Sequence, residues 1–272
     1  MTGPELSRTG DIPELKRLWQ EAFGDDEALI DGFFSTLYRP DSVFVIRDGD
    51  TVAAMACHLP MTICQGNRGW AASYLYAVAT DKRYRGHGLC GRLLGFAAGY
   101  LPSIGAKALL LVPGSSSLRE FYRQRGYANW TTVDMTELTV GPATGFTERI
   151  EAPVYLELRE QLLQDRAYVS CPVPVLEFQK LLAELYGGGL YRLSDGDREG
   201  CACVAVDGNG RAILYELLWP GDRAEGAALA ASAVGARRVL CRTPGHGAPF
   251  AMVQWLTQAP DLPAPYLGIA LD

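Results

Sequence analysis

Residues 78–94 of the chain read VATDKRYRGHGLCGRLL, and this stretch decides the fold. It begins as an apolar strand, continues as a basic turn with glycines, and ends in a segment with apolar residues at helical spacing. Glycines let the backbone of such a turn approach a bound anion closely, and free N–H groups at a helix start point at it. The helix dipole and the arginine side chains add positive potential. The sequence therefore predicts a diphosphate-binding turn made of Arg85, Gly86, His87 and Gly88, with a helix from about residue 89 to 100.

The turn alone does not identify the kind of phosphate site, because it matches neither G-x-G-x-x-G nor G-x-x-x-x-G-K-[ST]. A second segment makes the interpretation more specific. An apolar strand is expected at residues 107–112, followed by a Pro-Gly-Ser-Ser-Ser turn and by residues 118–127, LREFYRQRGY. Together the two segments resemble the GCN5-related N-acetyltransferase (GNAT) superfamily. The family's pyrophosphate signature, Arg/Gln-x-x-Gly-x-Gly/Ala, falls on residues 85–90, and its Phe-Tyr-x-x-x-Gly-Phe/Tyr segment falls on residues 121–127.

The resemblance implies acetyl-CoA (coenzyme A) as the cofactor. Two positions depart from the family pattern: Cys90 replaces the last Gly or Ala, and Ser115 stands where many members carry Asn. Both side chains are small, so cofactor binding is still expected. The implied cofactor-binding residues are Val78, Ala79, Thr80, Arg85, Gly86, His87, Gly88, Leu89, Cys90, Gly91 and Ser115.

The resemblance also implies direct transfer of an acetyl group to a primary amine of a small molecule or peptide. In the family, backbone N–H groups of the strand before the turn, here Val78, Ala79 and Thr80, meet the thioester oxygen; such fixed donors are typically worth ~10²–10³ in rate. Tyr122 falls where the family carries a tyrosine, and a phenol with a pKa of ~10 stays protonated at neutral pH and can protonate a leaving thiolate. The alternative is that Phe121 and Tyr122 only pack the helix face.

No residue is assigned as the general base. An alkylamine with a pKa of ~10.4 must lose a proton before attack. The candidates are His58, Asp134 and Glu137, or a chain of waters as in many family members. Cys90 as a nucleophile would need a neighbouring base and an orienting group, which the sequence does not show.

Composition limits the remaining function classes. The seven cysteines are scattered without a C-x-x-C pair, which is typical of reduced residues in a cytoplasmic protein without a metal site. No secretory signal or membrane-spanning segment is expected. The net charge of −6 disfavours nucleic-acid binding. Residues 151–272 hold 10 Lys and Arg against 15 Asp and Glu, which slightly favours a cationic acceptor unless this acidity serves solubility alone. No heptad pattern specifies an oligomeric state.

The order of predicted elements occurs twice along the chain. Helices are expected at residues 11–23 and 28–38, and strands at 42–47, 51–64 and 70–80, before the turn. A break at residues 141–145 follows. Beyond it we expect helices at 154–164, 175–186, 224–234 and 249–256, and strands at 190–193, 201–206, 212–218, 238–241 and 266–271. The fold class is thus α/β with tandem GNAT-like domains, each a mixed, mostly antiparallel sheet flanked by helices. This resembles the two GNAT domains of the enhanced-intracellular-survival acetyltransferases.

We therefore expect a catalytic GNAT domain at residues 1–145 and a degenerate GNAT-like domain at residues 146–272. In the second domain the corresponding turn, residues 219–225 (WPGDRAE), departs from the family's pyrophosphate signature. The turn has one glycine, a proline that lacks an N–H donor, and the carboxylates Asp222 and Glu225 near the helix start, which would repel a diphosphate. The second domain is thus expected to bind no acetyl-CoA. The alternative function is a non-catalytic acyl-CoA-binding or regulatory protein with the same fold.

Overall fold

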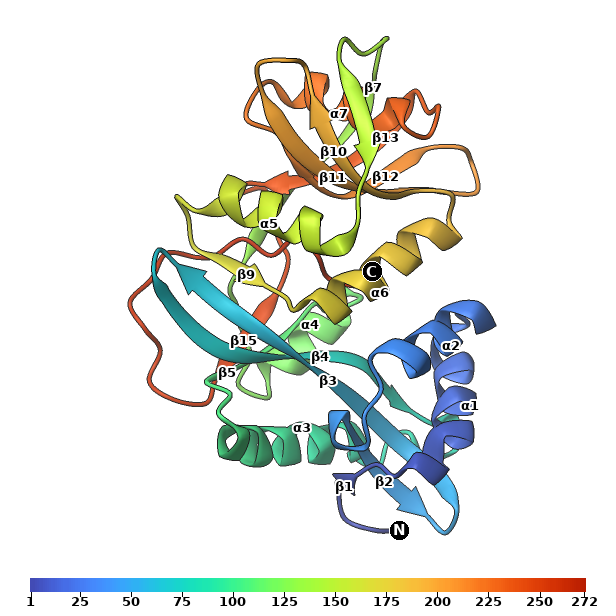
Figure 1. Cartoon of the computed structure of the whole chain (residues 1–272). Coiled ribbons are helices and arrows are strands. Elements are labelled where there is room, and N and C mark those ends of the chain that lie inside the picture. The colour runs from blue at the N-terminus through green and yellow to red at the C-terminus, as the bar shows by residue number, and fades with distance from the viewer. The chain divides into compact units, whose positions relative to one another are not determined.

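The computed structural model describes all 272 residues, which form two compact units (Figure 1). The first unit comprises residues 1–62, 70–128 and 252–260, and the second comprises residues 63–69, 129–251 and 261–272. Each has a mixed, mostly antiparallel sheet with helices packed on it, which confirms the predicted α/β class. No helix combines the length and the apolar character that crossing a membrane requires.

The first unit is a sheet whose main path has seven strands, and four α-helices flank it. Its sheet runs in the order β1-β2-β3-β4-β5-β15-β6, with β4 and β5 parallel. The helices are α1 (Ile12–Phe23), α2 (Glu27–Thr36), α3 (Leu89–Tyr100) and α4 (Ser116–Arg123). The strands are β1 (Glu5–Leu6), β2 (Val43–Asp48), β3 (Thr51–Gln65), β4 (Arg68–Thr80), β5 (Ala108–Leu111), β6 (Ala128–Asn129) and β15 (Met252–Trp255).

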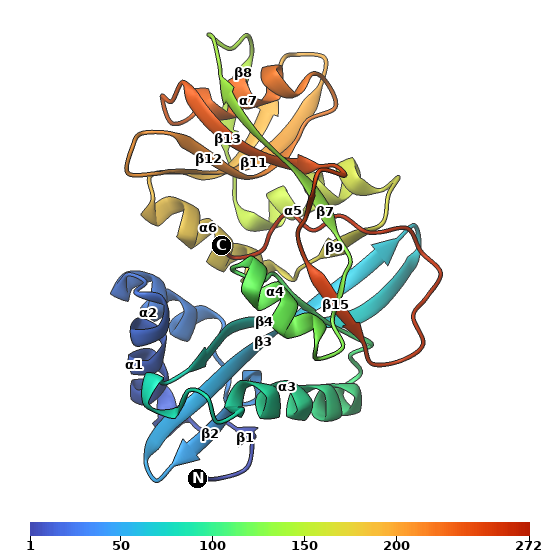
Figure 2. The same cartoon turned by 180° about the vertical axis from the view of Figure 1, so that it is seen from behind.

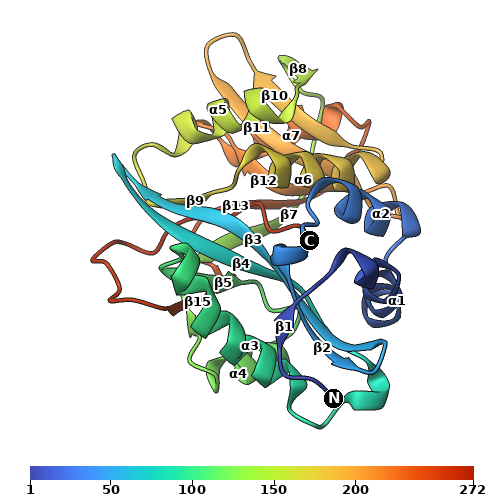
Figure 3. The same cartoon turned by 60° about the horizontal axis from the view of Figure 1, so that its bottom comes forward.

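The helices of the first unit divide between the two faces of its sheet (Figure 3). Side chains of successive strand residues point to opposite faces. Leu75 accordingly packs in one apolar cluster with Leu93 of α3 and Tyr122 of α4. The neighbouring Tyr76 meets Trp19 of α1 instead, with ring centroids 5.5 Å apart. The sheet is therefore buried on both sides, which explains the long apolar runs of β3 and β4.

The second unit repeats this topology. Its sheet runs β14-β7-β13-β12-β11-β10-β8, again with one parallel pair, β12 and β13. The strands are β7 (Thr132–Thr139), β8 (Phe146–Arg149), β9 (Tyr168–Ser170), β10 (Gly189–Ser194), β11 (Glu199–Val206), β12 (Ala212–Leu218), β13 (Arg238–Pro244) and β14 (Ala248–Pro249). The helices are α5 (Ala152–Leu163), α6 (Val173–Leu185) and α7 (Arg223–Ser232). Strands β10 to β13 with α7 thus repeat β2 to β5 with α3.

Strands are exchanged between the two halves of the chain, and β15 and β9 of the second half both pair in the first sheet, β9 with β3. Strand β7, from before residue 145, pairs antiparallel with β13 in the second unit. Strand β15 pairs antiparallel with β5 in the first unit, with Met252 opposite Leu111. In Figure 2, β15 carries the late-chain colour among the elements of the first unit. The compact units are therefore interleaved along the chain, whereas the break at residues 141–145 predicted a single division after residue 145.

Two predicted elements near the C-terminus are wrong. Residues 249–256 form strands β14 and β15 in place of a helix, because a short apolar run has no periodicity that separates a buried strand from a helix. Residues 266–271 form no strand, and one isolated bridge joins Tyr266 to Tyr168.

The exchanged strand predicts a measurable contribution to the first core. Met252 is fully buried in the cluster that holds Tyr122 and Tyr127, whereas Met135 of β7 is 45% exposed. We expect Met252→Ala to lower the free energy of unfolding by about 2–5 kcal/mol, because it leaves a cavity in the core. Met135→Ala should change it by less than about 0.5 kcal/mol. Urea unfolding of both variants checks this, and equal small effects would contradict the role of β15.

Candidate functional site

A pocket of about 570 Å³ lies in the first unit where β4 and β5 separate. The parallel pairing of the two strands ends at Tyr74 opposite Leu110, so residues 75–80 of β4 have no partner on the β5 side. Within this stretch Ala77 has a φ of +47°, a conformation that is uncommon for a residue other than glycine. The end of β4 is thus bent, and part of its backbone faces an open space.

Most of the predicted site residues line this pocket. They are Val78, Ala79, Thr80, Arg85, Gly86, Gly88, Leu89, Cys90, Gly91 and Tyr122. His87 and Ser115 are not among the lining residues. His87 is exposed in the turn, and Ser115 caps helix α4, where its Oγ accepts a hydrogen bond from the N–H of Leu118 at 3.2 Å. The structure therefore brings together both sequence motifs but leaves these two side chains outside.

The turn before α3 has the geometry of an anion site. Gly86 and Gly88 have φ values of +82° and +73°, which side chains with a Cβ rarely adopt. Residues 85–88 are all exposed, and no side chain caps the start of α3. The first N–H groups of this helix are therefore free to meet a bound anion. Arg85 makes one hydrogen bond, from Nε to the carbonyl oxygen of Thr80 at 3.1 Å.

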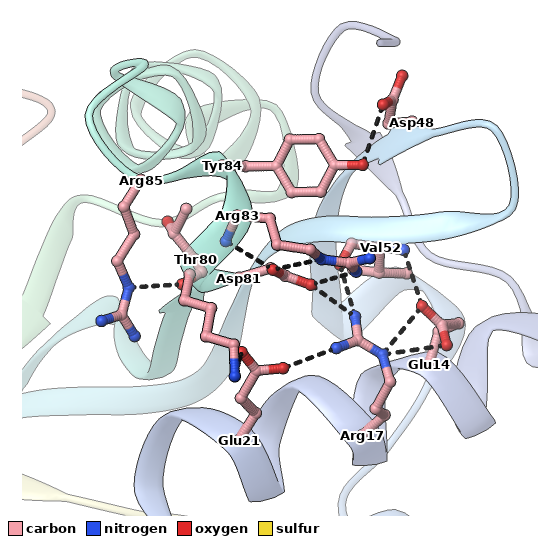
Figure 4. Close-up of polar contacts among 11 residues, drawn as sticks. Glu14, Arg17, Glu21, Asp48, Val52, Thr80, Asp81, Arg83, Tyr84 and Arg85 are labelled. Atoms are coloured by element: carbon pink, nitrogen blue, oxygen red, sulfur yellow. Dashed lines mark hydrogen bonds and ion pairs between the residues drawn. The ribbon is translucent and has the colours of Figure 1, made fainter.

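A buried carboxylate holds this turn in place (Figure 4). Asp81 is fully buried and accepts hydrogen bonds from the backbone N–H and the guanidinium of Arg83, at 2.9 Å and 2.7 Å. Arg17 of α1 contacts the same carboxylate at 3.1 Å. The hydrogen bonds from Arg83 hold the pKa of Asp81 well below its usual range. Asp81 was not singled out from the sequence. The only sequence feature that could have indicated its role is Arg83, a possible ion-pair partner two residues later.

Further contacts extend this network from the turn to α1 and β2. Arg17 also pairs with Glu14 at 3.1 Å and with Glu21 at 3.0 Å, both on α1. The hydroxyl of Tyr84, in the 3-10 turn Lys82–Tyr84, donates to Asp48 of β2 at 3.0 Å. The turn is thus attached to two neighbouring elements as well as to β4.

Tyr122 reaches the pocket from α4 with a protonated hydroxyl. Its side chain is buried, and its ring lies edge-on to Tyr127 with centroids 5.7 Å apart. The structure shows no hydrogen-bond partner for its hydroxyl within the protein. Burial raises the pKa of Tyr122, and the nearby Cys90 adds to the effect. The phenol is therefore protonated at any physiological pH and is available as a proton donor.

Cys90 is a poor candidate for a nucleophile. Burial raises the pKa of its thiol to about 11, whereas nucleophilic attack requires the thiolate. Cys90 is the second residue of α3, and it stands where the pyrophosphate signature ends in a glycine or alanine.

None of the three side chains considered as a general base lines the pocket. His58 has Nε2 2.6 Å from the carbonyl oxygen of Asp41, its ring stacks on Phe44, and burial lowers its pKa. Asp134 and Glu137 lie on β7 in the second unit. They pair with Arg223 at 2.8 Å and with Arg211 at 2.6 Å. These contacts give all three residues structural roles.

Comparisons with known proteins agree with the fold and with the first motif. Residues 5–129 match the sequence model of the acetyltransferase (GNAT) domain. No curated protein sequence matches the chain significantly. A GCN5-related N-acetyltransferase from Anabaena variabilis superimposes with a TM-score of 0.72 and 16% identity, over 93% of this chain and 72% of that one.

Two other solved structures resemble the chain to a similar degree. A GCN5-related N-acetyltransferase from Kribbella flavida has a TM-score of 0.68 and 16% identity, over 93% of this chain and 70% of that one. Eis1 from Mycobacterium abscessus has a TM-score of 0.67 and 11% identity, over 94% of this chain and 74% of that one. At such identities the likeness concerns the fold, and it extends over both units. The predicted tandem GNAT-like fold is confirmed.

The Asp81 network predicts a pH-dependent stability. Because the pKa of Asp81 is lowered in the folded protein, its carboxylate stabilises the fold above the unfolded-state pKa of about 3.9. This stabilisation is lost as the pH falls through the folded-state pKa. We expect Asp81→Asn to lower the free energy of unfolding by about 2–4 kcal/mol at pH 7, with a difference from the parent that narrows below pH ~4.

Urea unfolding at pH 7, 4 and 3 measures this difference. Asp50→Asn is the matched control, because Asp50 is exposed, and its effect should stay below about 0.5 kcal/mol. A loss of stability in Asp81→Asn that is the same at every pH would show that the charge of Asp81 is not what the network stabilises.

Proposed function

We propose that this chain transfers an acetyl group from acetyl-CoA to a primary amine of a small molecule or peptide, and the match of residues 5–129 to the acetyltransferase (GNAT) domain model supports this. One observation carries the proposal: the phosphate turn, the open end of β4 and the hydroxyl-bearing Tyr122 all line a single pocket. Acyl transfer from a thioester to an amine needs a site that binds the cofactor, groups that polarise the carbonyl and a proton donor for the leaving thiolate.

The turn supports binding of the diphosphate of acetyl-CoA. The uncapped start of α3 offers N–H groups, the dipole of the helix adds a partial positive charge, and Arg85 adds a full one. The left-handed glycines keep side chains away from the path of the phosphates. The anchor at Asp81 keeps this geometry fixed before the ligand arrives, so little ordering is needed on binding.

The end of β4 supports polarisation of the thioester carbonyl. Backbone N–H groups of residues 78–80 that point to the β5 side have no strand partner there. As the amine nitrogen attacks the carbonyl carbon, negative charge develops on the carbonyl oxygen, and fixed N–H donors stabilise it. The bend at Ala77 is the backbone feature that directs this part of the strand.

Tyr122 supports departure of the thiolate. When the carbon–sulfur bond breaks, the electron pair stays on sulfur, and the Tyr122 hydroxyl donates its proton to that sulfur. The raised pKa of the Cys90 thiol, about 11, reports how strongly this pocket disfavours a thiolate. Burial in this pocket would disfavour a CoA thiolate by the same desolvation, which favours its protonation as it leaves. The proton lost by the amine then restores the phenol through solvent.

The amine nitrogen loses its first proton to solvent in this scheme, because the pocket contains no Asp, Glu or His side chain among its lining residues. The acceptor is a primary amine, with a cationic small molecule as the class that the acidic chain favours.

Acceptor-dependent release of free thiol from acetyl-CoA tests the proposed activity. The panel holds polyamines, aminoglycosides, amino acids and short peptides, with an acceptor-free control. Thiol release with one class identifies both the reaction and the acceptor. Binding of acetyl-CoA without release on any acceptor would favour the acyl-CoA-binding protein, and absence of binding would contradict the assignment of the turn.

Tyr122→Phe should separate catalysis from binding. We expect kcat to fall by roughly 10²–10⁴ because the proton donor is lost. The affinity for acetyl-CoA should remain within about threefold, since the ring is kept. Tyr127→Phe is the matched control: Tyr127 is also buried and packs on the Tyr122 ring, but it does not line the pocket. Its kcat should stay within about twofold, and equal losses in both variants would indicate a packing role for Tyr122.

Arg85→Glu should abolish binding of acetyl-CoA by placing a negative charge beside the diphosphate. We expect the dissociation constant to rise at least about 100-fold, as for loss of a charge-assisted contact with added repulsion. Arg92→Glu makes the same change of charge one turn into α3, where Arg92 contacts the carbonyl oxygen of Thr2 and does not line the pocket. Calorimetric titration should give a value within about threefold of the parent for this control. Equal weakening by both would point to a general field effect.

A further inference from the structure

A second pocket, of about 320 Å³, lies within the second unit at the position equivalent to the first pocket. The first pocket is lined by the end of α1, the end of β4 and the turn that follows. The second is lined by the end of α5, the end of β12 and the turn that follows. The parallel pairing of β12 and β13 also stops early, at Leu214 opposite Cys241, so these two strands separate as β4 and β5 do.

This second pocket lacks the features that hold a diphosphate. Asp222 caps α7, where its carboxylate accepts a hydrogen bond from the N–H of Ala224 at 2.8 Å. Glu225 adds a second carboxylate in the first turn of the helix, paired with Arg198 at 2.9 Å. The start of α7 is therefore occupied and negatively charged, in contrast to the uncapped start of α3. A nucleotide cofactor would be repelled here.

The pocket nevertheless keeps polar groups that have no partner in the protein. Thr243 is 7% exposed, and its buried Oγ1 makes no hydrogen bond. Arg166 is exposed and forms no ion pair, whereas Arg223, the other cation of the lining, is already bound to Asp134. A buried hydroxyl without a partner is costly, so a ligand that accepts a hydrogen bond from it would be favoured.

The remaining lining is apolar. Leu163, Leu217 and Leu218 form the walls with Trp219. The combination of one uncommitted cation, one unpaired hydroxyl and apolar walls fits a molecule with an anionic head and a short apolar tail. The volume is near the lower end of the range of roughly 300–1,000 Å³ for small-molecule pockets, which sets the size of the tail.

We propose that the second unit binds a small carboxylate with an apolar tail in this pocket. The carboxylate pairs with Arg166 and accepts the hydrogen bond of Thr243, and the tail packs on the leucines and on Trp219. This site is separate from the proposed acetyl-CoA site and does not depend on transferase activity. The second unit is then a ligand-binding module whose pocket lies at the same place in the fold as the first pocket, but has carboxylates at the helix start in place of free N–H groups.

Calorimetric titration of the full chain with hexanoate tests the proposal, with tryptophan fluorescence to locate the site. We expect saturable binding of hexanoate and none of hexylammonium, which has the same tail and the opposite charge. Arg166→Glu should raise the dissociation constant at least about tenfold. Thr243→Val, which keeps the shape, should raise it about threefold to tenfold. The fluorescence change should disappear in Trp219→Phe.

Arg85→Glu separates this site from the first pocket, because it should leave hexanoate binding unchanged while acetyl-CoA binding is lost. Absence of saturable heat in the parent protein would overturn the proposal. An unchanged dissociation constant in Arg166→Glu, with its circular dichroism spectrum intact, would overturn it as well. Both results are independent of whether the protein turns over acetyl-CoA.

Discussion

The first pocket depends on one buried negative charge. A carboxylate without contact to water is stable only when cations and hydrogen-bond donors surround it. Asp81 meets this requirement through Arg83 of its own turn and Arg17 of α1. These contacts fix the chain one residue after β4 ends, while the backbone N–H of Asp81 donates to Ala53 at 2.9 Å. From this point residues 85–88 pass over the surface to the start of α3. The turn at residues 85–88 is exposed, whereas Asp81, which anchors it, is buried.

The second unit shows what the same fold becomes without this anchor. Trp219 follows β12 at the place where Asp81 follows β4. The buried carboxylate of this unit is instead Glu216, which lies inside β12 and pairs with Arg159 of α5 at 2.8 Å and with the Tyr155 hydroxyl at 3.0 Å. This charge joins the strand to a helix and does not contact the turn that follows β12. The repeated topology thus preserves a pocket in each unit, while the buried carboxylate lies just after the strand in the first unit and inside the strand in the second.

The sequence predicted those parts of the site whose physics is local. The turn at residues 85–88 and the helix after it follow from glycine conformation and helical spacing within short segments, whereas Tyr122 was singled out by the family resemblance. The burial of Asp81 could not be predicted, because it depends on Arg17, which is 64 residues away in the chain. The side-chain positions of His87 and Ser115 also depend on tertiary packing, which the motif does not specify. The exchange of β7 and β15 was missed for a related reason: pairing between strands is a long-range property, and a four-residue apolar strand carries little periodic signal.

The exchange also connects the proposed catalytic residue to the end of the chain. Met252 of β15 belongs to the same apolar cluster as Tyr122 and Tyr127. The turn that joins these tyrosines passes through Gly126, whose φ is +87°, and a Cβ added there would lie 3.2 Å from the side-chain nitrogen of Gln254 on β15. Every motif residue of the pocket lies before residue 129, yet the packing that positions Tyr122 includes residues 252–255. The first unit can therefore reach its final structure only after the second half of the chain has been synthesised, because its sheet lacks a strand until then.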